Sequence, residues 1–415
     1  MKFNRAWVFR HCVSDRGAAR GGVAAHVRIA VFQVVTIACW IATLEACSKS
    51  DHETADAGLG IVTGGGAASS AGGSAPGACL AGTAPDEAGR CTRAESAGGS
   101  GGTSPAPPTT FLTTRGRALY YDDQPFRVIG INAFGMAGCE TGRAYSDAQM
   151  DAFFGSLRPR ALTRAWAFEA QGITGVERMV RWAEAHSQLL VLSLADGAGF
   201  CNESDGRTGG EGTRKAESWY VDGYKARYLP WLEKVVTRFK DSPAIGMWEL
   251  INEPSGTTDQ IMRAFLDDAA AHVKAIDPNH LVMSGSQAEY VRGTSDFAYV
   301  HAGPDIDVAS LHEYDYDDSG SRTIVTPHLR PALSAMAKLD KPLLISEVGI
   351  DGGMTSDCTD LNTRRDAFKE KLDAYLSREG VVGMMIWSWV PKARSGCFYE
   401  AGPDDPIMDL LRTYE

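Results

Sequence analysis

Several features that define large classes of proteins are missing from this chain of 415 residues. Its uncharged apolar run, Ile29 to Leu44, has sixteen residues, fewer than the roughly 20 that a membrane-spanning helix needs. No glycine-rich phosphate loop follows an early apolar run, because Gly130 stands alone there. The cysteines after residue 110 lack the CxxC and His–Cys spacings of zinc sites. A formal net charge of −11 does not suit a nucleic-acid partner.

The first 46 residues have the composition of an export signal. Residues 1–28 carry six Lys and Arg against one Asp, and the apolar run follows directly. The end of this segment, Leu44-Glu45-Ala46-Cys47, resembles a bacterial lipoprotein signal, in which the cysteine is lipidated, although Glu45 is unusual there. An ordinary signal peptide cleaved nearby is the alternative. We therefore expect an exported chain, secreted or at the cell surface, that meets a membrane only through a lipid on Cys47.

Residues 47–110 have the composition of a linker. They are rich in Gly, Ser, Ala and Pro. Such a segment cannot bury enough apolar area to offset the entropy lost on ordering. We expect a flexible linker here and a folded domain over residues 111–415, which carries most of the acidic charge.

Strand-like and helix-like patterns alternate through residues 111–415. The predicted strands are residues 128–134, 161–168, 189–194, 244–253, 281–284, 308–314, 343–348 and 384–390. The predicted helices are residues 147–157, 176–186, 224–239, 260–276, 329–339, 365–376 and 407–411. Eight such strands favour an α/β fold of the (β/α)8 TIM-barrel type. The alternative is an open doubly wound sheet, which normally has the phosphate loop that is missing here.

Polar and aromatic residues gather at the ends of the predicted strands, where barrels of this kind hold their functional sites. They are Asn132, Arg164, Trp166, Asp196, Asn252, Glu253, His312, Tyr314, Glu347, Trp387 and Trp389. Two of them, Glu253 and Glu347, follow apolar runs at the predicted fourth and seventh strands. Two carboxyl groups about 5 Å apart are what retaining glycoside hydrolysis requires, one as acid/base and one as nucleophile.

The domain resembles glycoside hydrolase family 5. The resemblance lies in Trp248-Glu-Leu-Ile-Asn-Glu-Pro254, in His312-Glu-Tyr314, in Lys341-Pro-Leu-Leu-Ile-Ser-Glu347 and in Arg164 and Trp387. The first of these motifs is most similar to the endo-β-1,4-mannanase branch. Many cellulases of the family carry histidine after the third strand, whereas this chain has Ala195-Asp196, which also favours mannanase.

The resemblance implies a role for each matching residue. Glu253 would be the acid/base and Glu347 the nucleophile. The substrate-binding residues would be Arg164, Asn252, His312, Tyr314 and Trp387. Among them Arg164 would keep the nucleophile ionised, Asn252 would bind the sugar 2-hydroxyl and Trp387 would form the apolar floor. Trp166, Trp219 and Trp389 are looser candidates for neighbouring sugar subsites.

The expected function is retaining endo-hydrolysis of β-1,4-mannan by a monomer that needs no metal or cofactor. A β-1,4-glucanase or a mannan transglycosylase would use the same two glutamates. A carbohydrate-binding protein on an inactive barrel is the non-enzyme alternative. In every case the partner is a neutral polysaccharide.

Four cysteines of the domain are predicted to form two disulfides, since an even set in an exported chain favours pairing. Cys139 and Cys201 follow the first and third strands, and Cys358 and Cys397 follow the seventh and eighth. Both pairs would lie on the face of the barrel that holds the strand ends.

Overall fold

The computed structural model describes residues 110–414 except 140–143, 200, 202–213, 286–295, 317–321, 357 and 394, together with 83–85 and 91–93. These residues belong to one compact unit, Ala78–Glu415. Inside the expected linker, β1 (Thr83–Pro85) and β2 (Cys91–Arg93) pair antiparallel. The expected export signal and Cys47 lie outside the described residues.

Eight parallel strands form a TIM barrel, as the sequence predicts. They are β6 (Val128–Asn132), β7 (Leu162–Trp166), β8 (Leu189–Ser193), β9 (Ile245–Glu249), β10 (Leu281–Met283), β11 (Ala309–Glu313), β12 (Leu343–Gly349) and β13 (Val381–Trp387). Their order in the sheet is β10-β9-β8-β7-β6-β13-β12-β11. A parallel bridge between Met283 and Val308 joins the two ends of this order and closes the barrel.

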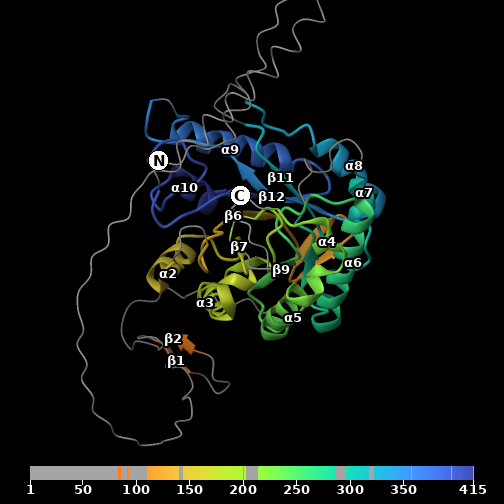
Figure 1. The fold of residues 1–415 in the computed structure, drawn as a ribbon. Coiled ribbons are helices and arrows are strands. Elements are labelled where there is room, and N and C mark those ends of the chain that lie inside the picture. The colour runs from red at the N-terminus through yellow and green to blue at the C-terminus, as the bar shows by residue number, and fades with distance from the viewer. Residues whose placement is uncertain are drawn as a thin grey trace, which may run out of the picture. The chain divides into compact units, whose positions relative to one another are not determined.

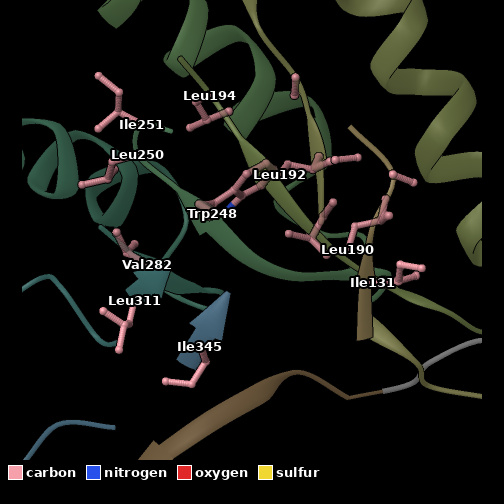
Figure 2. Close-up of a cluster of buried hydrophobic side chains, with 14 of the residues drawn as sticks. Ile131, Leu190, Leu192, Leu194, Trp248, Leu250, Ile251, Val282, Leu311 and Ile345 are labelled. Atoms are coloured by element: carbon pink, nitrogen blue, oxygen red, sulfur yellow. The ribbon is translucent and has the colours of Figure 1, made fainter. Parts of the chain in front are cut away.

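The strands are buried on both faces because their apolar residues alternate between two clusters. In β8, Leu189 and Val191 belong to the cluster inside the barrel, whereas Leu190 and Leu192 belong to the larger cluster between strands and helices. Figure 2 shows part of the larger cluster, including Leu190, Trp248 and Ile345. Near-continuous apolar runs therefore produce these strands.

The helices surround the strands (Figure 1). They are α2 (Asp147–Gly155), α3 (Gly172–Ala185), α4 (Glu217–Val221), α5 (Tyr228–Phe239), α6 (Asp259–Ile276), α7 (Phe297–His301), α8 (Leu329–Leu339), α9 (Leu361–Leu376) and α10 (Pro406–Thr413), with short 3₁₀ turns at Glu169–Gln171 and Gly223–Ala226. Several begin at capping side chains, such as Ser146 before α2 and Asp360 before α9. None of the described helices combines the length and apolar character needed to cross a membrane.

A small antiparallel sheet precedes the barrel and was not predicted. It comprises β3 (Leu112–Arg115), β4 (Ala118–Tyr121) and β5 (Gln124–Phe126). Leu112, Leu119 and Tyr121 share the inner cluster with the first residues of the barrel strands, such as Val128 and Leu162. The sheet therefore covers the N-terminal end of the barrel and leaves the C-terminal end for the site.

Candidate active site

The main chain that carries Glu253 is held in an uncommon conformation. The prediction that its strand continues to residue 253 is wrong, because β9 ends at Glu249. Glu253 has a φ of 48°, in the left-handed region that few residues other than glycine adopt. Its N–H donates to the carbonyl of Gly285 at 3.0 Å. Such a conformation costs free energy and is typical of functional positions.

Glu253 and Glu347 face each other across His312. Nδ1 of His312 lies 2.9 Å from Oε1 of Glu253 and 3.4 Å from Oε1 of Glu347. One oxygen of each carboxylate and a nitrogen of His312 all lie within 4.8 Å of one another. This spacing corresponds to the ~5 Å separation of retaining glycosidases and is well below the ~6.5–9.5 Å of inverting ones.

Arg164 connects these groups from the centre of the barrel. It is fully buried, and each of its N–H groups has an acceptor. Nη1 donates to Glu347 at 2.6 Å and to Asn132 at 2.9 Å. Nε and Nη2 form a bidentate pair with Glu249 at 2.7 and 2.5 Å, and Nη2 also donates to Asn252 at 2.7 Å. The guanidinium therefore joins Glu249 and Asn252, in the motif at residues 248–254, to Glu347, in the motif at residues 341–347.

The surroundings of the two glutamates differ in kind. Glu347 accepts hydrogen bonds from Arg164 and, at 2.6 Å, from the hydroxyl of Tyr314, and these contacts stabilise a carboxylate anion. Burial raises the pKa of Glu347, and the charge of Arg164 and the Tyr314 hydrogen bond oppose that rise. Burial raises the pKa of Glu253 to about 8. Burial also lowers the pKa of His312 to about 4, so this imidazole is neutral at pH 7.

Trp387 lies at the end of β13 and is partly exposed. Its ring stacks on Phe134 with centroids 5.0 Å apart and an interplanar angle of 8°. Behind them Trp166 packs against both Phe134 and Phe168. The aromatic floor implied by the resemblance therefore has a second layer of rings beneath it.

The looser aromatic candidates do not line the site. Trp166, Trp219 and Trp389 are 2%, 7% and 3% exposed. Trp219 packs among Tyr220, Tyr224, Tyr228 and Phe265, and Trp389 packs against Phe153. Their rings are covered by neighbouring side chains, so they support the core of the domain.

Both predicted disulfides are present, Cys139–Cys201 and Cys358–Cys397. The first packs beside the aromatic layer, because Cys139 and Cys201 belong to the cluster of Phe134, Trp166 and Phe168. The pairing inferred from export and strand-end position is confirmed.

Glu249 is a member of the site that the sequence reasoning missed. It is fully buried within β9, and its carboxylate is the bidentate partner of Arg164. A signal was available, since an acidic residue in a strand predicted to be buried on both faces needs a charged partner.

Among the described residues, Glu253, His312 and Glu347 form the set whose atoms are spaced as metal ligands would be. Arg164 already supplies a positive charge to Glu347 in this set. Glu253 contacts a neutral imidazole, and Glu347 accepts hydrogen bonds from a guanidinium and a phenol. Two carboxyl groups in such surroundings can transfer a proton and attack a carbon without an added ion.

A barrel with two facing carboxyl groups at the C-terminal ends of its strands is the arrangement of retaining glycoside hydrolases. A family model described as "GH family 5 beta-mannosidase-like" matches residues 175–400, and the chain belongs to this family.

Relatives and solved structures resemble the chain over different lengths. "Probable mannan endo-1,4-beta-mannosidase F" of Aspergillus flavus is 30% identical over 208 residues, which cover 46% of this chain and 43% of the relative. "Mannan endo-1,4-beta-mannosidase 8" of Oryza sativa subsp. japonica is 26% identical over 67% of this chain and 90% of its own length. The crystal structure of the endo-1,4-beta-mannanase from Rhizomucor miehei aligns with a TM-score of 0.56 and 17% identity over 73% of this chain and 98% of its own, which supports the barrel fold.

Proposed function

We propose that this protein is a retaining endo-β-1,4-mannanase. The observation that supports it most is the pair Glu253 and Glu347, with one oxygen of each within 4.8 Å of the other. The names of the family and of its fungal and plant relatives support mannan as the substrate.

In the first step Glu253 donates its proton to the glycosidic oxygen while the Glu347 carboxylate attacks the anomeric carbon. The bond to the leaving sugar breaks and a glycosyl ester on Glu347 forms. In the second step Glu253, now a carboxylate, takes a proton from a water that attacks the same carbon. The ester bond to Glu347 breaks and Glu347 leaves as a carboxylate, so the product keeps the β configuration and both glutamates return to their starting forms.

The neighbouring residues have distinct roles in this mechanism. Arg164 and Tyr314 hold the Glu347 oxygens by the hydrogen bonds described above. His312 orients Glu253. Asn252 binds the sugar 2-hydroxyl, and Trp387 contacts the apolar face of the reacting sugar.

Product analysis on soluble β-mannan, glucomannan and carboxymethyl-cellulose tests the substrate. Mannan carries an axial 2-hydroxyl, and a mismatch at a hydrogen-bonded hydroxyl can lower kcat/KM by roughly 10²-fold or more. We expect short manno-oligosaccharides, with kcat/KM higher on the mannans than on the cellulose derivative. Activity on the cellulose derivative alone would assign a β-1,4-glucanase that uses the same glutamates.

We also infer that the protein is exported, because two disulfides suit an oxidising compartment. The lipid anchor at Cys47 and the monomeric state stay predictions from the sequence. The fungal and plant origin of the relatives does not support a bacterial lipoprotein signal.

A further inference from the structure

Asp196 lies between the loop after β8 and the main chain that presents Glu253. It is 1% exposed and pairs with Asn252 through a parallel bridge. The N–H of Asn252 donates to the carbonyl of Ala195 at 2.8 Å, and the N–H of Gly197 donates to the carbonyl of Asn252 at 2.6 Å. A Cβ on Gly197 would lie 2.8 Å from the Glu253 carbonyl oxygen, so the two segments are in close contact.

The carboxylate of Asp196 gathers donors from both segments. Oδ1 accepts from the N–H of Ala198 at 3.0 Å and from Nδ2 of Asn252 at 3.3 Å. Oδ2 accepts from the N–H of Cys201 at 3.3 Å. Asp196 thus links a disulfide-bonded cysteine to the residue next to Glu253.

These contacts determine which way the Asn252 amide points. Its oxygen accepts from Arg164 at 2.7 Å, and its nitrogen donates to Asp196. A flipped amide would place its NH₂ group against the guanidinium and its oxygen against the carboxylate. Asp196 and Arg164 together therefore select a single orientation.

We propose that Asp196 is a positioning residue, whose carboxylate fixes the Asn252 amide and the turn that presents Glu253. The inference rests on the proposed function of Glu253 as the acid/base. It goes beyond that function because it gives Asp196, which follows the third barrel strand β8, the role of orienting Asn252 and Glu253, which follow the fourth barrel strand β9.

The charge of Asp196 provides a readout that a purely structural residue would not have. Burial is the main cause of the raised pKa of Glu253; Asp196 and Glu249 raise it further, while Arg164 and Arg214 lower it. Within the described part of the chain, the charged and titratable groups around Glu253 are Arg164, Asp196, Arg214, Glu249, His312, Tyr314 and Glu347. Removing the Asp196 charge should therefore lower the pKa of Glu253.

The test compares Asp196→Asn and Asp196→Glu with Asp404→Asn, a control on an exposed aspartate before α10. For Asp196→Asn we expect kcat on soluble β-mannan to fall about tenfold or more, since small misplacements are costly. The basic limb of the pH profile should move down by roughly 0.5–1 pH unit. Asp196→Glu keeps the charge but displaces Asn252, so its kcat should fall while its basic limb stays in place. Asp404→Asn should match the unmodified protein in both respects.

Titration of the Glu253 carboxyl by ¹³C NMR, assigned with Glu253→Gln, gives a measurement that needs no substrate. An unmodified protein inactive on every polymer would refute the proposed function, and the titration would still test Asp196. A folded Asp196→Asn protein with unchanged kcat and unchanged Glu253 titration would overturn the inference. If Asp196→Asn does not fold, unaltered kcat in Asp196→Glu would overturn it.

Discussion

At the scale of single residues, Arg164 explains why two similar glutamates can take different roles. It donates directly to Glu347, whereas Glu253 is in contact with a neutral imidazole. A cation in contact favours the ionised form of a carboxyl group, and burial without such contact favours the protonated form. The contrast supports Glu347 as nucleophile and Glu253 as proton donor.

Replacing Glu347 by Ala should lower kcat by on the order of 10³-fold or more, because it removes the proposed nucleophile. Azide added with an aryl β-manno-oligosaccharide should enter the vacated space and give a glycosyl azide of inverted configuration. Glu253→Ala is the matched comparison, and its azide product should retain the configuration. Circular dichroism checks the fold. A folded Glu347→Ala protein with near-native turnover would refute the role.

The pH profile of kcat/KM should fall on its alkaline side near pH 8. The reactive form of Glu253 is protonated, and its raised pKa of about 8 means that this form is lost as the pH rises through that value. On the acidic side activity falls as Glu347 takes up a proton. A substrate with a strongly acidic phenol as leaving group needs no protonation, so glycosylation of the enzyme by it should not show the alkaline limb. An alkaline limb centred below pH 6 on mannan would contradict the assignment of Glu253 as the proton donor.

Much of the site could be predicted from the sequence, and the predictions that failed did so for physical reasons. Arg164, His312, Tyr314 and Glu347 lie together as the motifs implied. The end of the strand before Glu253 was misplaced, because the apolar residues Leu250 and Ile251 extend the pattern beyond Glu249, where β9 ends. Glu249 was missed although a buried acidic residue needs a charged partner, because the sequence alone does not place Arg164 beside it.

At the scale of elements, long apolar patterns were predictable and short segments were not. The bounds of α8 match the prediction, and all eight barrel strands were found within a few residues of their ends. The three strands β3 to β5 were missed because, taken together, their residues mix polar and apolar side chains and form no long apolar run. Their position depends on covering the end of the barrel, which is a tertiary effect that local patterns do not carry.

The strand β11 is anchored from its outer side. His312 and Tyr314 contact Glu253 and Glu347, the two glutamates proposed as catalytic. Glu313 between them accepts from Lys371 at 2.7 Å and from Tyr375 at 2.8 Å, both on α9. Both charged side chains of the Glu313–Lys371 pair are almost fully buried. The pair therefore stabilises the position of β11 in which His312 and Tyr314 contact Glu253 and Glu347.

Lys371→Met should destabilise the protein by about 3–5 kcal/mol, because it leaves the Glu313 carboxylate buried without its cation. Lys369→Met is a matched control on the same helix, since this lysine is 57% exposed and pairs with Asp373. Its cost should be about 0.5 kcal/mol or less. Urea unfolding followed by fluorescence measures both. Equal free energies of unfolding for the two variants would show that the buried pair contributes little.

At the scale of the whole molecule, crosslinks and site lie at the same end of the barrel. The sheet β3–β5 covers the opposite end, while the disulfides join segments that follow β6, β8, β12 and β13. Loops that carry binding residues gain from such restraint, since they have few ladder hydrogen bonds of their own.

Removing either disulfide should therefore lower stability, but only one should strongly affect activity. The bonds close segments with sequence separations of 62 and 39 residues, for which the loss of unfolded-chain entropy suggests ~4 kcal/mol each. Thermal unfolding of Cys139→Ser/Cys201→Ser and Cys358→Ser/Cys397→Ser measures the effect. The first variant should also lose kcat, because residue 201, whose main-chain N–H donates to Asp196, is no longer held by the crosslink beside the rings under Trp387. Unchanged Tm in both variants, or an equal loss of kcat in both, would contradict this division between stability and function.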